Sequence, residues 1–63
     1  MSTYAEKNRK TKRLIQQSFI RILERKPFES ITVGDIANEA AVNRGTFYLH
    51  YEDKYDLLAQ MER

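Results

Sequence analysis

Apolar residues recur at helical spacing in the first half of the chain. Between about residues 9 and 26, Ile15, Phe19, Ile22 and Leu23 fall at positions i, i+4, i+7 and i+8, and mostly polar residues separate them. This spacing places the four side chains on one face of a helix. The sequence therefore predicts a long amphipathic first helix.

The segments on either side of this helix lack the pattern. Residues 1–8 show no apolar periodicity, and we expect them to form a loose basic tail. Pro27 disfavours a helical conformation at the residue before it and has no backbone N–H to donate. We therefore expect the helix to end at Pro27 and residues 27–30 to form a short connector.

A second, shorter helix has clear start signals. Thr32 is a good N-cap, Asp35 adds negative charge to the first turn, and Ile31 before the cap can pack onto Ile36. A narrow apolar stripe follows, and its small residues allow another helix to approach closely. Its members are Val33, Ile36, Ala37 and Ala40. The helix is predicted to end near Ala40.

Two further helices are predicted after this one. Asn43 can cap a third helix, in which Phe47 and Tyr51 share the core-facing side, and Asp53 with Asp56 can open a fourth. The apolar face of the fourth helix consists of Leu57, Leu58 and Met61. No segment alternates with the period of a strand. The predicted fold class is all-α.

Composition narrows the possible chemistry. The chain has 63 residues, no cysteine, one histidine and two glycines. These numbers exclude disulfides, a multi-histidine metal site and a glycine-rich phosphate loop. His50 beside exposed carboxylates lacks a closed set of metal ligands, and no apolar run is long enough to span a membrane. We expect a cytoplasmic domain without enzymatic activity, cofactor, metal or membrane partner.

Charge is distributed unevenly. Residues 1–26 carry eight Lys and Arg against two acids, whereas residues 27–63 carry three against seven. A basic block is typical of proteins that bind polyanions, although cations also simply solvate a helix face. For residues 7–13 two interpretations stay open: a disordered, solvated arm, or an arm that follows the DNA backbone or a minor groove.

The short second and third helices suggest a helix-turn-helix supported by the first helix. In that arrangement the third helix presents its outer face to the major groove of DNA. No acid occurs between Ala40 and Tyr51, as a surface facing phosphates requires. The residues expected on this outer face are Asn43, Arg44, Gly45, Thr46, Tyr48 and His50. The alternative is a small module for protein–protein interaction that uses its tyrosines and the basic first helix.

A family resemblance supports the DNA-binding interpretation. Its most specific part is the run Thr-Phe-Tyr-Leu-His-Tyr at residues 46–51, with a lysine four residues beyond the histidine. Together with residues 31–37, this pattern closely resembles the DNA-binding domain of the tetracycline-repressor (TetR) family. The resemblance covers residues 9–63 and implies a homeodomain-like three-helix fold, a helix-turn-helix motif at about 32–51, and the start of a fourth helix.

The resemblance also implies contacts to the DNA backbone. Thr32 and Val33, which open the second helix, are expected to touch phosphates. Gly34 holds a position from which some relatives reach a base, but it has no side chain to do so. The family also uses an aromatic residue, a histidine and a lysine on the backbone, which correspond here to Tyr48, His50 and Lys54.

The recognition helix is expected to begin with Asn43, Arg44, Gly45 and Thr46. Arg44 can bind guanine O6 and N7 bidentately, and a phosphate contact is its alternative role. Thr46 can contact a thymine methyl group or a phosphate. A core position is the alternative for Tyr48, and a structural hydrogen bond is the alternative for His50.

Two departures from the family pattern stand out. Ala41 occupies the turn where relatives often have glycine. If residue 41 must adopt a left-handed conformation, alanine costs about 1 kcal/mol more than glycine there. The larger C-terminal domain of relatives, which dimerises and binds a small-molecule inducer, has no counterpart in these residues. The resemblance implies a sequence-specific regulator of bacterial transcription, most often a repressor, that binds a double-stranded operator as a homodimer.

Overall fold

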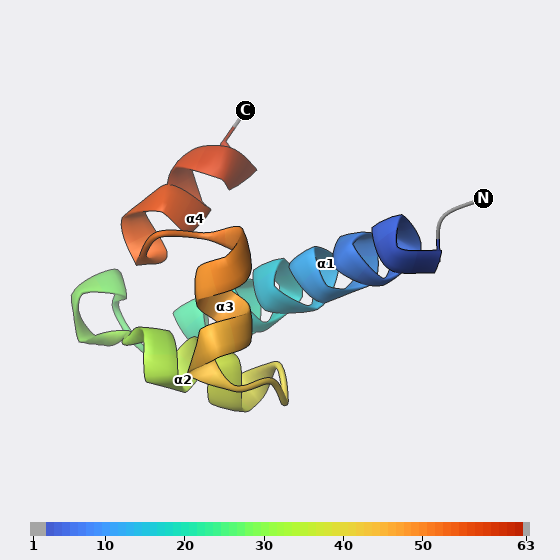
Figure 1. Cartoon of the computed structure of the whole chain (residues 1–63). Coiled ribbons are helices and arrows are strands. Elements are labelled where there is room, and N and C mark those ends of the chain that lie inside the picture. The colour runs from blue at the N-terminus through green and yellow to red at the C-terminus, as the bar shows by residue number, and fades with distance from the viewer. Residues whose placement is uncertain (1–2, 63) are drawn as a thin grey trace.

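The computed structural model describes residues 3–62, and every regular element in this range is helical (Figure 1). Four α-helices and one short 3-10 helix follow one another: α1 Thr3–Leu23, η1 Phe28–Ser30, α2 Val33–Glu39, α3 Arg44–His50 and α4 Lys54–Met61. The predicted all-α class is confirmed. Within the described residues no helix combines the length and the hydropathy needed to cross a membrane.

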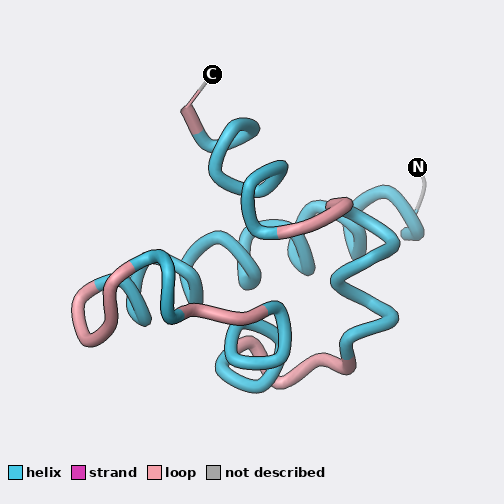
Figure 2. The backbone as a smooth tube through the Cα atoms, turned by 90° about the vertical axis from the view of Figure 1, so that its left-hand side faces the viewer, coloured by secondary structure: helices cyan, strands magenta, loops and turns pink. Residues whose placement is uncertain are grey.

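The long helix α1 supports the two helices of the helix-turn-helix. It packs against α2, and α2 packs against α3. In Figure 1, α3 crosses in front of α1, and the N-terminal end of α1 reaches past it to the right. The view in Figure 2 shows the loops that join α2 to α3 and α3 to α4. The α3 helix therefore packs on α2, and its Phe47 joins the core that residues of α1 also form.

One core holds these helices together. Its members lie on all four helices or within two residues of a helix end: Ile15, Phe19, Ile22, Ile31, Ile36, Ala40, Phe47, Tyr51 and Leu57. The helical spacing of apolar residues in the sequence predicts nearly all of these core positions. The same spacing also places Leu23 on this face, but its side chain is 39% exposed. Burial of whole aromatic and branched side chains provides the main stabilisation of so small a fold.

The boundaries of α1 differ from the prediction at both ends. Helix begins at Thr3, so the prediction of a loose tail is wrong for residues 3–8, while residues 1 and 2 lie outside the described range. This segment lacks an apolar stripe, yet it contains good helix formers and Glu6 in the first turn. At the other end, the amides of Arg25 and Lys26 both donate to the carbonyl of Ile22 (2.8 and 2.9 Å). The chain thus leaves the helix before it reaches the proline.

Side-chain caps start the three shorter helices where they are predicted. The capping oxygen accepts from the amide three residues later at 3.0, 2.8 and 2.8 Å, in Thr32, Asn43 and Asp53 respectively. The Asp35 carboxylate also accepts from the Thr32 amide at 3.0 Å, which completes a capping box. Each cap satisfies an amide that the helix leaves without a partner.

The turn between α2 and α3 depends on one strained residue. Ala41 has a φ of 59°, in the left-handed region that disfavours any residue with a Cβ. The Val42 amide donates back to the Ala37 carbonyl at 2.9 Å, which fixes this turn. Ala41 therefore does adopt the left-handed conformation that is costly for alanine, and this conformation sets the angle at which α3 leaves α2.

Candidate nucleic-acid interface

The side of α3 that faces away from the core is exposed and free of acids. Phe47 is fully buried, whereas Tyr48 and Leu49 are 55% and 81% exposed. No carboxylate lies between Ala40 and Tyr51 in the sequence. The exposure of Tyr48 excludes its alternative role as a core residue. Leu49 was not among the predicted site residues, although it lies two positions from Phe47, on the opposite side of the helix.

Arg44 lies next to the start of α2. A methyl group at Gly34 would lie 3.9 Å from Arg44 Cδ and 3.5 Å from Thr32 Oγ1. The structure therefore brings these three predicted site residues together. Arg44 is exposed, and within the described part of the chain it forms no ion pair with a carboxylate. Its guanidinium charge is available to a ligand.

A tight cap fixes the beginning of α3. The Asn43 side-chain oxygen accepts from both the amide and the hydroxyl of Thr46, at 2.8 and 3.1 Å. A Cβ at Gly45 would lie 3.2 Å from the same oxygen, which is closer than ordinary contact. Glycine at position 45 thus avoids a close contact with the capping oxygen of Asn43, and no side chain projects from the helix at this position.

His50 lies at the other end of α3, near the basic start of α1. Partial burial lowers the pKa of His50 from its usual value of 6.5, and the charge of Lys12 lowers it further. The Lys12 ammonium also lies 5.6 Å from the centre of the Tyr51 ring. The basic segment 7–13 is helical and flanks α3, so the interpretation as a disordered arm is wrong.

Lys54 makes internal contacts that the sequence does not predict. Its ammonium donates to the backbone carbonyls of Phe28 and Ile31, at 2.6 and 2.8 Å. It also lies 4.4 Å from the centre of the Phe28 ring and 5.6 Å from that of Tyr55. Lys54 therefore ties the start of α4 to the segment before α2. Its phosphate contact stays a prediction.

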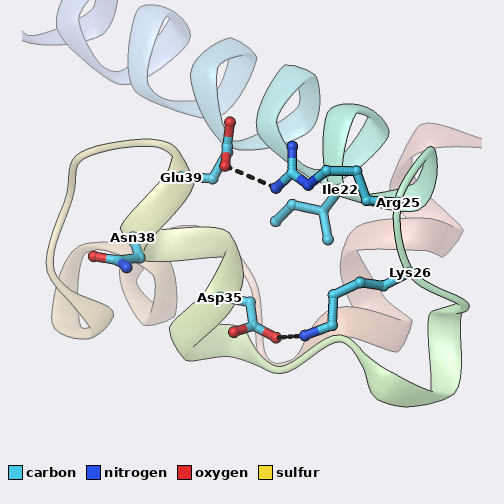
Figure 3. A pocket seen from close by; sticks show the side chains of 6 residues that line it. All are labelled: Ile22, Arg25, Lys26, Asp35, Asn38 and Glu39. Carbon is cyan, nitrogen blue, oxygen red and sulfur yellow. Dashed lines mark hydrogen bonds and ion pairs between the residues drawn. The ribbon is translucent and has the colours of Figure 1, made fainter.

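A groove between α1 and α2 contains paired charges (Figure 3). It has a volume of about 230 Å³. In it Arg25 pairs with Glu39 at 3.1 Å, and Lys26 pairs with Asp35 at 2.9 Å. The Lys26 hydrogen bond, aided by the Thr32 amide, lowers the pKa of Asp35 below its usual value of 3.8. The groove is lined by Ile22, Arg25, Lys26, Asp35, Asn38 and Glu39.

The fold and the exposed third helix together define a helix-turn-helix domain of the kind found in transcriptional regulators. Comparison with known families gives the particular group. The family described as "Bacterial regulatory proteins, tetR family" matches residues 20–61. The chain belongs to this family of DNA-binding regulators, and the resemblance seen in the sequence is confirmed.

Two curated relatives from Bacillus subtilis (strain 168) agree with this result. The "Uncharacterized HTH-type transcriptional regulator YerO" is 41% identical over 51 residues, which are 81% of this chain and 17% of that protein. The "Uncharacterized HTH-type transcriptional regulator YxbF" is 36% identical over 53 residues, 82% of this chain and 14% of that protein. The chain thus spans less than a fifth of either relative. No solved structure matches it.

Proposed function

We propose that this chain binds double-stranded DNA sequence-specifically, with α3 in the major groove. One observation carries the proposal: the exposed side of α3 lacks acids, while Arg44 beside it forms no ion pair within the described residues. Phosphates line both edges of the groove, so a carboxylate on this face would be repelled and a free guanidinium attracted.

Residues 43–46, at the N-cap and first turn of α3, are assigned to base recognition, two through contacts and two through the position of the helix. Arg44 binds guanine O6 and N7, and the absence of a side chain at Gly45 lets the helix approach closely. Thr46 contacts a thymine methyl group through its own methyl group, because its amide and its hydroxyl both donate to the Asn43 oxygen; a phosphate contact would require the hydroxyl to turn away from Asn43. Asn43 holds the helix start in place through the oxygen that accepts from Thr46.

Residues around the groove are assigned to the DNA backbone. Thr32 and Val33 at the start of α2 contact one strand, and Tyr48 and His50 on α3 contact the other edge of the groove. Lys54 adds positive charge near a phosphate and holds α4 in position. The basic face of residues 7–13 extends this surface, because the segment is helical and lies beside the end of α3.

The action of the whole regulator follows from the family resemblance. We infer that the protein represses transcription in the bacterial cytoplasm, at the nucleoid. It acts as a homodimer that places two α3 helices in successive major grooves of a near-palindromic operator. A small-molecule inducer binds a domain beyond these residues and changes the spacing of the two helices. Two linked half-sites then provide most of the affinity.

An NMR titration tests DNA binding by this chain. Amide signals are followed while an arbitrary-sequence duplex is added at low salt, a condition that reveals even weak binding. Binding as proposed shifts the signals of residues 32–34, 43–50 and 54 in addition to those of residues 7–13, and these shifts fade as salt is added. Shifts confined to residues 7–13 would mean that DNA is attracted only to the positive charge of this basic segment. A folded chain without any shifts would favour a protein-interaction module instead.

Two arginine variants test base recognition. Arg44→Ala is expected to lower affinity for a preferred sequence by about 1–3 kcal/mol and to flatten the preference at one position. Arg25→Ala, which removes a charge paired with Glu39 at 3.1 Å, is the matched control and leaves the preference unchanged. If Arg44→Ala weakens binding to all duplexes equally, Arg44 contacts a phosphate rather than a base.

A further inference from the structure

We propose that Leu49 recognises the C5-methyl group of a thymine in the bound DNA, an inference that rests on the proposed DNA binding. Leu49 is 81% exposed, more than any other large hydrophobic residue described. The five others in this class are between 39% and 64% exposed, and three of them lie on α1. Leu49 is thus an apolar side chain at the centre of a polar, acid-free face.

Helix geometry places Leu49 on the outermost row of α3. Successive residues turn by about 100°, so Leu49 and Gly45 each lie roughly 200° from the buried Phe47. Because Gly45 has no side chain, Leu49 projects alone from this row. Polar or aromatic neighbours flank it on the two sides: Arg44 and Tyr48 on one, Thr46 and His50 on the other.

The chemistry of the major groove limits what an aliphatic side chain can contact. Most groups on the base edges are hydrogen-bond donors or acceptors, which Leu49 cannot satisfy and would only desolvate. The thymine methyl group is the apolar exception. An isolated exposed leucine is common on protein surfaces. Here, however, it lies opposite the buried Phe47, on the side of α3 that the proposed binding turns toward the bases.

A selection experiment with two DNA libraries tests this assignment. The immobilised 63-residue chain selects duplexes at low salt from a random library made with thymine, and from the same library made with deoxyuridine, which lacks only the methyl group. We expect thymine to be enriched roughly fourfold at one position, the effect of burying about one methyl group. Deoxyuridine at this position should not be enriched.

Two variants complete the test. Leu49→Ala should lose the enrichment of thymine while it keeps the preference due to Arg44, and the variant should fold because the site is exposed and alanine favours helix. Leu14→Ala, which removes a 48% exposed leucine from α1, is the matched control and should select like the parent chain. Circular dichroism confirms that each variant is helical.

The outcomes separate this inference from the proposed function. If the parent chain binds neither library, the proposed DNA binding itself fails. If it selects sequences but enriches uridine as strongly as thymine, DNA binding stands and the methyl contact is refuted. A loss of preference in Leu49→Ala that also occurs with the deoxyuridine library refutes it as well, because Leu49 then contacts something other than the methyl group.

Discussion

The groove between α1 and α2 and the outer face of α3 are both polar, but they differ in whether their cations are paired with carboxylates. In the groove between α1 and α2, Glu39 lies 3.1 Å from Arg25 and 3.6 Å from Arg21, while Lys26 lies 2.9 Å from Asp35. On the outer face of α3, Arg44 has no such partner among the described residues. One surface neutralises its cations internally, and the other leaves its cation available.

This difference matters more for binding than for stability. Exposed ion pairs typically contribute only about 0.2–1 kcal/mol to folding, so the groove adds little to the stability of the domain. A cation that already has a carboxylate partner attracts phosphate less, because the carboxylate repels the incoming anion. The α1–α2 groove is therefore expected to stay away from DNA, and the α3 face to contact it.

The largest effect is expected from a change at Lys54. This residue follows α3 closely in the sequence, but its ammonium group is paired within the protein, as that of Lys26 is in the groove. Lys54→Met should lower the free energy of unfolding by about 2 kcal/mol, because two backbone carbonyls lose a charged donor. Thermal unfolding followed by circular dichroism measures this loss. Lys26→Met, which removes a half-exposed pair with Asp35, is the matched control and should cost less than about 1 kcal/mol. Equal losses in the two variants would show that the Lys54 contacts are no stronger than a surface pair.

The next largest effect is expected when a carboxylate is placed on the acid-free face. Tyr48→Glu should weaken DNA binding at least about tenfold, or 1.4 kcal/mol, through repulsion by phosphates. Stability should change little, because Tyr48 is 55% exposed. Gln17→Glu on the exposed side of α1 adds the same charge away from α3 and serves as the control. If both variants weaken binding equally in a fluorescence titration, net charge rather than the α3 face governs affinity.

The sequence predicts most of this fold because the helices are specified by residues that lie close together in the chain. Caps act over three residues and apolar spacing over seven or eight, so Thr32, Asn43 and Asp53 reveal where helices begin. The sequence does not predict the start of α1 at Thr3, because residues 3–8 have helix propensity without an apolar stripe. Periodicity alone cannot detect such a solvent-exposed helix extension.

The site is less predictable, since part of it depends on contacts between distant residues. Arg44 and Tyr48 follow from the third helix alone. The role of Lys54 does not, because its partners Phe28 and Ile31 lie 26 and 23 positions earlier in the chain. Leu49 had a detectable signal in its position opposite Phe47. An aliphatic side chain offers no hydrogen bond to DNA, so a search for polar contacts does not find it.

A substitution in the turn between α2 and α3 is expected to have a smaller effect, and to stabilise the fold rather than destabilise it. Ala41→Gly should raise the free energy of unfolding by about 1 kcal/mol, because glycine adopts a φ of 59° without strain. Ala40→Gly is the matched control: Ala40 is buried with a φ of −80°, so the change removes a packed methyl group and should destabilise. Chemical unfolding measures both. A destabilising Ala41→Gly would mean that flexibility gained in the unfolded chain outweighs the strain relieved in the turn.

The smallest effect concerns His50, where stability and DNA binding should respond to pH in opposite directions. Desolvation, and then the charge of Lys12, lowers the pKa of His50 below 6.5 in the folded chain. The neutral form therefore stabilises the fold above pH 6.5, and this contribution is lost as the pH falls through the folded pKa. The carboxyl of Asp35 does not interfere, because its pKa is lowered from 3.8.

A phosphate beside His50 would reverse that preference, because it stabilises the imidazolium and raises the pKa in the complex. DNA affinity should therefore increase a few-fold between about pH 7.5 and about pH 5.5, while the free chain becomes slightly less stable. His50→Gln should remove both pH dependences and keep a neutral hydrogen-bonding side chain. Parallel titrations with DNA and thermal melts at each pH measure the two trends. An affinity that stays constant while stability falls would assign His50 to the fold alone, as a structural residue that the acid-free face happens to include.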